Sequence, residues 1–248
     1  MNIARSLARR SPMTAGVVLL LAALTSCTTT APQVAATPDP LWAAYTAAVR
    51  STAVYQSEHV KPLKPLAADA GGKVLVVTAT GSVPANPLSK NTWVTLVPEV
   101  RDICRGWSGD VAMQLRQLLG LPPDVNVTRV VVMRANAADV FRPSPDPAIG
   151  TICPCSLPPA GGKCTFTPEQ ECGNQFPPNT SPAHISFIAN QSLGARPIPR
   201  GYPWTALGYT YNWKPEAADS YGASEYVVRR QAQVEIIQAV SPQAYCAP

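Results

Sequence analysis

Apolar residues at helical spacing predict two well-defined helices in this chain. The acid and proline at Asp39-Pro40 are typical of a helix N-cap and first helical position, so we expect a helix from there to about Ser51. A second helix is predicted from a cap at Ser108 to Leu119, because apolar side chains recur every three or four residues there. Gly120 follows as a stop.

Short apolar stretches elsewhere predict β-strands. They are rich in β-branched or aromatic residues and are bounded by turn-forming residues. Because strands and helices do not alternate regularly, two or three helices among about six strands favour an α+β domain with a mostly antiparallel sheet. The predicted strands are Lys73–Thr80, Trp93–Val97, Val127–Met133, Ala183–Ala189, Leu207–Trp213 and Glu225–Ile237.

Residues 1–26 have the layout of a signal peptide. Arg5, Arg9 and Arg10 precede an apolar run, Ala15 to Leu24, that holds no charge. The run is about ten residues long, whereas a membrane-spanning helix needs about twenty. We therefore expect residues 1–26 to be removed after export, and a permanent transmembrane anchor is the weaker interpretation.

The end of this leader, Leu24-Thr25-Ser26-Cys27, resembles the lipobox of bacterial lipoproteins. The resemblance implies that Cys27 is acylated and becomes the first mature residue, and several acyl chains hold a protein stably at a membrane. Thr28, in place of an aspartate, is similar to the signal that directs lipoproteins of Gram-negative bacteria to the outer membrane. The expected location is therefore the cell envelope, facing the periplasm. The alternative is an ordinary signal peptide with a chance cysteine.

Composition beyond the leader is typical of one folded domain on a tether. Residues 27–38 are rich in Thr, Ala and Pro and carry no charge, which predicts a flexible segment. Residues 39–248 contain no second linker and are expected to form a single globular domain outside the cytoplasm. Loss of three leader arginines lowers the net charge from +5 to about +2, too small an excess to indicate nucleic-acid binding.

Cysteines other than Cys27 are even in number, which predicts three disulfides in an oxidising compartment. Their pairing stays open because six cysteines allow fifteen connectivities, although a Cys153–Cys155 bond would strain the disulfide geometry. A four-cysteine zinc site is the alternative, but the spacing does not match two C-x-x-C pairs, and we expect no metal. The six are Cys104, Cys153, Cys155, Cys164, Cys172 and Cys246.

Catalytic motifs are scarce. The sequence contains no G-x-S-x-G, H-E-x-x-H, P-loop or G-x-G-x-x-G motif, which disfavours the commonest hydrolases, metalloproteases and nucleotide-binding proteins. The chain has two histidines, His59 and His184, so a metal site built on several imidazoles is excluded. His184 is a candidate base for a serine hydrolase, with a structural hydrogen-bonding role as the alternative. No cofactor is predicted.

Two segments resemble the ADP-ribosyltransferase toxins of bacteria. Val131-Val132-Met133-Arg134 is similar to the strand whose arginine supports the nicotinamide-ribose site, and the stretch that begins at Glu225 is similar to the strand of the catalytic glutamate. The resemblance implies that Arg134 orients NAD and that Glu225 binds a ribose hydroxyl and stabilises the transition state. The family's Ser-Thr-Ser strand is absent, and Ala223 stands where a second carboxylate is expected.

Aromatic residues are concentrated between Tyr202 and Tyr226. Strand alternation predicts that several of them share one face, which would form a binding platform for glycans, peptides or partner proteins if it were exposed. The alternative is that these rings fill the core. Arg196, Arg200 and Lys214 lie nearby and are candidates to hold an anionic group, or are simply solvated surface. The candidate binding residues are Tyr202, Trp204, Tyr209, Tyr211 and Trp213.

Three hypotheses about function follow. The first is a non-catalytic envelope lipoprotein that binds a glycan, a peptide or an envelope protein through its aromatic residues. The second is a secreted enzyme, either ADP-ribosyltransferase-like or of another class, that uses Arg134 and Glu225. The third is an assembly factor of a larger envelope complex, which would present an exposed apolar patch.

Overall fold

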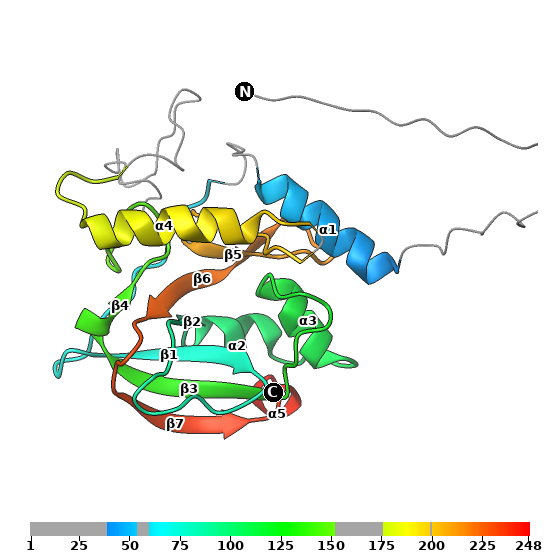
Figure 1. Ribbon diagram of the computed structural model, residues 1–248. Coiled ribbons are helices and arrows are strands. Elements are labelled where there is room, and N and C mark those ends of the chain that lie inside the picture. Colours follow the sequence, from blue (N-terminus) through cyan, green and yellow to red (C-terminus); the bar gives the residue numbers. More distant parts are fainter. Residues whose placement is uncertain (1–38, 54–59, 152–175, 199) are drawn as a thin grey trace, which may run out of the picture. The chain divides into compact units, whose positions relative to one another are not determined.

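A computed structural model describes residues 39–53, 60–151, 176–198 and 200–248 (Figure 1). Within these residues the chain has an α+β fold with a seven-stranded antiparallel sheet. Several predictions fall outside the described residues, namely the signal peptide, the tether and the residues Cys27, His59, Cys153, Cys155, Cys164 and Cys172.

The sheet has the strand order β4-β6-β2-β1-β3-β7. The remaining strand, β5, pairs with β6 outside this order. Strands β1 and β3 form the longest pairing, from Lys73 opposite Asn136 to Thr80 opposite Arg129. The strands are β1 (Lys73–Thr80), β2 (Thr92–Leu96), β3 (Arg129–Asn136), β4 (Val140–Phe141), β5 (Tyr209–Tyr211), β6 (Tyr221–Val228) and β7 (Val234–Val240).

The helices pack in two groups around this sheet. Figure 1 shows α1 and α4 near β5 and β6, while α2, α3 and α5 gather toward one end of β1, β3 and β7. A short 3-10 turn, Ala137–Asp139, joins β3 to β4. The helices are α1 (Pro40–Thr52), α2 (Glu99–Cys104), α3 (Val111–Leu118), α4 (Pro182–Ala195) and α5 (Pro242–Tyr245).

The central strands bury residues on both faces of the sheet. On one face, Val76 and Met133 belong to a cluster with Tyr226. On the other face, Val77 and Val132 pack with residues of α2, α3 and α5. A strand covered on both sides requires apolar residues at successive positions, which explains the nearly continuous apolar runs in β1 and β3.

One predicted strand is wrong, because Ala183–Ala189 lies within α4. Ser181 caps this helix by accepting a hydrogen bond from the His184 backbone, and Pro182 occupies the first turn. The buried residues His184 and Ile188 are four positions apart, which is helical spacing. A short apolar run fits both periods, so the flanking cap residues are the better indicator.

Other element boundaries also differ from the prediction. The stretch Glu225–Ile237 is not one strand but parts of β6 and β7, separated by a turn in which Gln231 has a φ of 69°. The cap of α3 is Asp110, which accepts a hydrogen bond from Met113, and not Ser108. Gly120 follows the end of α3 with a φ of 66°, as its role as a helix stop requires.

A disulfide joins Cys104 at the end of α2 to Cys246 after α5. The two cysteines are 142 positions apart in sequence, and both lie in the apolar cluster beneath α3. The bond therefore ties the C-terminal end of the chain to the helical side of the sheet. Among the described helices, none has the length and apolar character needed to span a membrane.

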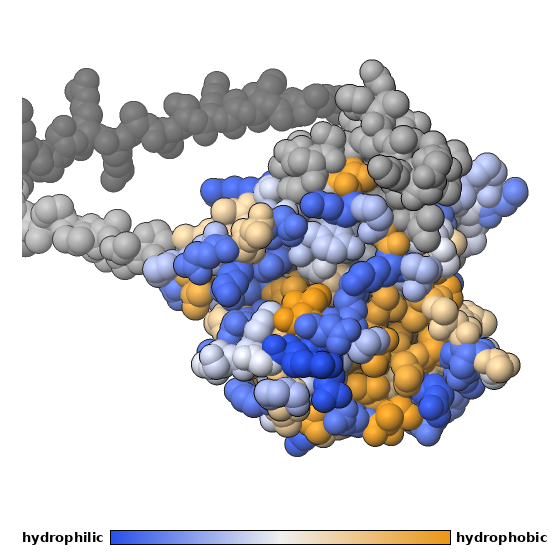
Figure 2. Space-filling view, turned by 180° about the vertical axis from the view of Figure 1, so that it is seen from behind, coloured by the Kyte–Doolittle hydropathy of each residue, from blue (hydrophilic) through white to orange (hydrophobic). Residues whose placement is uncertain are grey.

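Apolar residues lie on part of the surface that faces away from the viewer in Figure 1. Figure 2 shows a broad area of hydrophobic residues in its lower half, beside hydrophilic ones. Exposed large apolar side chains include Leu75 on β1 and Ile237 on β7. Nothing in the structure indicates what would cover them.

Candidate functional site

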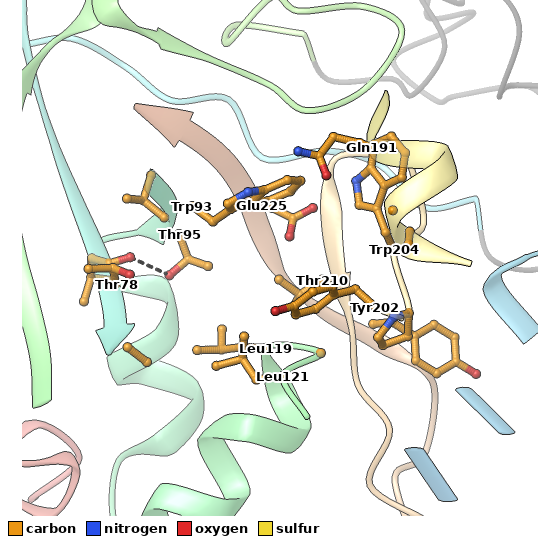
Figure 3. Close-up of a pocket in the computed structure, with 18 residues that line it drawn as sticks. Thr78, Trp93, Thr95, Leu119, Leu121, Gln191, Tyr202, Trp204, Thr210 and Glu225 are labelled. Atoms are coloured by element: carbon orange, nitrogen blue, oxygen red, sulfur yellow. Dashed lines mark hydrogen bonds between the residues drawn. The ribbon is translucent and has the colours of Figure 1, made fainter. Parts of the chain in front are cut away.

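A cavity of about 410 Å³ lies against the face of the sheet that also carries α3. Strands β1, β2, β5 and β6 contribute to its walls, together with the residues after α3, the C-terminal half of α4 and the loop Tyr202–Trp204 (Figure 3). The cavity therefore combines segments that are far apart in the sequence. Its volume falls within the range of small-molecule sites.

Glu225 is the acidic residue of this cavity. Strand alternation on β6 places Ser224 and Tyr226 on the opposite face of the sheet, and Glu225 lies opposite Thr95 of β2. Figure 3 shows its carboxyl group directed into the cavity. Glu225 Oε2 is buried and accepts no hydrogen bond from any described residue. Burial raises the pKa of Glu225 to about 8, because the charged form loses its hydration.

Two tryptophans face the same space. The ring centroids of Trp93, from β2, and Trp204 lie 6.5 Å apart at an interplanar angle of 87°, so the rings form perpendicular walls. Phe187 of α4 supports the Trp93 ring at 6.4 Å. Trp204 Nε1 is a second buried polar atom without a hydrogen-bond partner in the part of the chain that is described. Two residues of the cavity lining thus carry an unused acceptor and an unused donor.

The opposite wall is held by hydrogen bonds from β5 and the residues after it to the end of α3 and the residues after it. Thr210 Oγ1 donates to Leu118 O at 2.7 Å, and Trp213 Nε1 donates to Leu121 O at 2.9 Å. At Gly120, an added Cβ would lie 3.3 Å from the Tyr211 carbonyl oxygen, so a glycine permits this close approach. These contacts hold this wall of the cavity against the end of α3.

The ionisable side chains that line the cavity are all acids. No lysine, arginine or histidine is among the residues that line it, within the described ranges. Besides Glu225, the titratable residues of the lining are Tyr202 and Tyr211. Gln191 of α4 adds a neutral amide (Figure 3). The site offers no charged partner to an anion, and it offers a carboxyl group to a cation.

The predicted aromatic residues divide into two groups. Tyr202, Trp204 and Tyr211 line the cavity, and Tyr202 remains 48% exposed. Tyr209 and Trp213 are buried in apolar clusters and are inaccessible to a ligand. These two rings face the core and do not form part of an exposed platform. The cationic candidates Arg196, Arg200 and Lys214 do not line the cavity, and Arg200 pairs with Asp124 at 3.4 Å.

The structure does not bring Arg134 and Glu225 together. Strands β1 and β2 lie between β3 and β6, and three strand spacings of about 4.8 Å put the two backbones about 14 Å apart. Arg134 Nη1 instead bonds to Glu235 Oε2 at 3.0 Å on β7, on the side away from Glu225. This arrangement gives no support to a shared nicotinamide-ribose site.

His184 lies in the first turn of α4 and outside the cavity lining. Its Nε2 is 2.7 Å from the Ser144 carbonyl oxygen, and its ring stacks on Phe187 at 6.1 Å. Burial lowers the pKa of His184, so the neutral ring is favoured. These contacts match the structural role that was one of its two interpretations.

Sequence reasoning did not single out Trp93, Gln191 or the scaffold residue Arg142. Trp93 belongs to a predicted strand and shares a face of it with Thr95, so strand alternation could have placed its ring on that face of the sheet. The Arg142 side chain is fully buried, and its Nη2 donates to Tyr226 Oη and to the Thr151 carbonyl oxygen, each at 3.0 Å. It thereby fastens the segment after β4 to the sheet.

Comparison of the chain with protein-family models, curated proteins and solved structures finds no match. Among the described residues, no group of three or more His, Cys, Asp or Glu residues is placed to hold a metal ion.

Proposed function

We propose that the chain is a lipid-anchored protein of the bacterial cell envelope that binds a small ligand in the cavity at Glu225. The observation that carries this proposal is the presence of two buried, unpartnered polar atoms, Glu225 Oε2 and Trp204 Nε1, in one aromatic cavity. An unsatisfied buried polar group costs about 1–3 kcal/mol. A ligand that bonds to both atoms would recover this energy.

The kinds of side chain around Glu225 support binding in preference to catalysis. Glu225 has no carboxylate, histidine or metal-binding cluster beside it among the described lining residues. The two aromatic walls supply apolar area at small entropic cost, as in many ligand sites. We therefore favour the ligand-binding hypothesis over the enzyme hypothesis for this domain.

The envelope location is the second part of the proposal. It depends on the lipobox-like segment that ends at Cys27, and the disulfide between Cys104 and Cys246 supports it, because such bonds persist in oxidising compartments. In a bacterial host, Cys27→Ala is expected to move the protein from the membrane fraction to the soluble fraction or to leave it unprocessed. An unchanged membrane fraction would contradict acylation at Cys27.

Cavity binding can be tested with a matched pair of glycine variants. Gly194 lines the cavity and Gly150 does not, and at each of them an added Cβ meets no atom within 4 Å. The protein and the variants Gly194→Phe and Gly150→Phe are heated with a panel of neutral sugars, short peptides, amines and quaternary ammonium salts.

We expect a panel compound to raise the Tm of the unmodified protein and of Gly150→Phe by about 5–10 °C when present at about one hundred times its Kd. The same compound should shift Gly194→Phe much less, since the phenyl group reduces the space available. If no compound shifts the Tm, or if all three proteins shift equally, the cavity is not the binding site.

A further inference from the structure

We propose that the cavity binds an organic cation, with an ammonium group placed against the Glu225 carboxylate and the rings of Trp93 and Trp204. This inference rests on the proposed function and narrows it to one class of ligand. Figure 3 shows the three side chains around a common space, contributed by β2, β6 and the loop before β5.

The electrostatics of the cavity favour a cation over an anion or a neutral ligand. Glu225 is buried without a positively charged partner, and no basic side chain is among the described lining residues. A buried carboxylate is stabilised strongly when it gains a charge-assisted contact. A cation would supply that contact, whereas an anion would meet a carboxyl group and the faces of aromatic rings.

The aromatic walls favour an ammonium group in particular. A cation within about 6 Å of a ring centroid is attracted by the negative face of the ring, most strongly for tryptophan. The Trp93 and Trp204 rings both line the cavity with their centroids 6.5 Å apart, so a compact cation in the cavity lies near both rings. Tyr202 and Tyr211 lie in the same lining and extend the aromatic enclosure.

Binding of a cation should be coupled to loss of the Glu225 proton. The pKa of Glu225 is about 8 in the free protein, so the group must ionise to bind the cation best. The titratable residues that share the cavity are Tyr202 and Tyr211, and the lining residues from β2, α4 and the end of α3 are uncharged. For a quaternary ammonium ion, which does not titrate, Kd should fall about 50-fold between about pH 6 and pH 8.

The test uses isothermal titration of the full chain in a non-ionic detergent. The probes are tetramethylammonium, choline and benzyltrimethylammonium, each compared with the neutral isostere in which carbon replaces the quaternary nitrogen. We expect at least one cation to bind about tenfold or more tightly than its isostere, with the pH dependence given above. Glu225→Gln should abolish both the preference and the pH dependence.

Glu235→Gln is the matched control, because Glu235 is an exposed acid on β7 and does not line the cavity. It should leave the Kd of each cation unchanged. The comparison with neutral isosteres uses the unmodified protein, so it remains decisive even if Glu225→Gln does not fold. If a neutral compound from the glycine-variant panel binds and no cation is preferred, the cation inference is wrong and the proposed function stands. If nothing binds, both fail.

Discussion

Replacement of the buried carboxyl group by Glu225→Gln is expected to change how stability depends on pH. Burial raises the pKa of Glu225 to about 8 from an ordinary value of 4.5. An acid with a raised pKa in the folded state contributes stability at low pH that is lost as pH rises, because the unfolded chain ionises first. Between about pH 5 and pH 9, the free energy of unfolding should therefore fall by about 4 kcal/mol relative to the glutamine variant.

Urea unfolding of the two proteins at a series of pH values, with disulfides intact, measures this difference. The groups that titrate elsewhere contribute equally to both proteins and cancel in the comparison. Glu235→Gln serves as the control, because the Glu235 side chain is 63% exposed and its loss should leave the pH profile parallel to that of the unmodified protein. If the profile of Glu225→Gln is also parallel, the burial argument for Glu225 is refuted.

Three further perturbations test the scaffold, each by urea or thermal unfolding. Converting Cys104 and Cys246 to serine should lower the free energy of unfolding by about 5 kcal/mol in the chain-entropy model, because the disulfide spans 142 positions. A loss below about 1 kcal/mol would argue against this disulfide. Arg142→Met should lower the free energy of unfolding by about 3–5 kcal/mol, because buried acceptors lose their donor. The control Arg134→Met removes an exposed ion pair and should change the free energy of unfolding by less than about 1 kcal/mol. Equal effects of the two substitutions would contradict the burial argument for Arg142. Tyr45→Phe removes a buried hydroxyl that donates a hydrogen bond to the Gly201 carbonyl oxygen at 2.6 Å. This loss should lower the Tm by about 2–4 °C, and an unchanged Tm would show that the hydrogen bond contributes little to stability.

Much of the fold could be predicted from local patterns. The strand Lys73–Thr80 has the predicted bounds, because a strand buried on both faces needs a continuous apolar run. The helix at Pro40–Thr52 begins where the cap and the proline place it. These features depend on neighbouring residues in the chain, so a single sequence was sufficient to identify them.

The candidate site was only partly predictable. Glu225 and Trp204 were candidate site residues from the sequence. The resemblance to ADP-ribosyltransferase toxins, however, placed Glu225 with Arg134, and the strand order separates β6, which carries Glu225, from β3, which carries Arg134. Tyr209 belonged to the candidate platform and is buried in the core. A strand pattern shows that two faces exist, but it does not show which face another segment covers.

By itself, the sequence determined the elements whose causes are local: the caps, the glycine stop after α3 and the central apolar strands. Tertiary structure alone decided that Glu225 would lie beside Trp93 and Trp204 in a cavity without a basic residue among its described lining. The physical reason is that these residues meet through the pairing of β2 with β6 and the packing of α4 against β2, contacts between segments that are far apart in the sequence. Loop closure and burial across the whole domain select such contacts, and no local pattern specifies them.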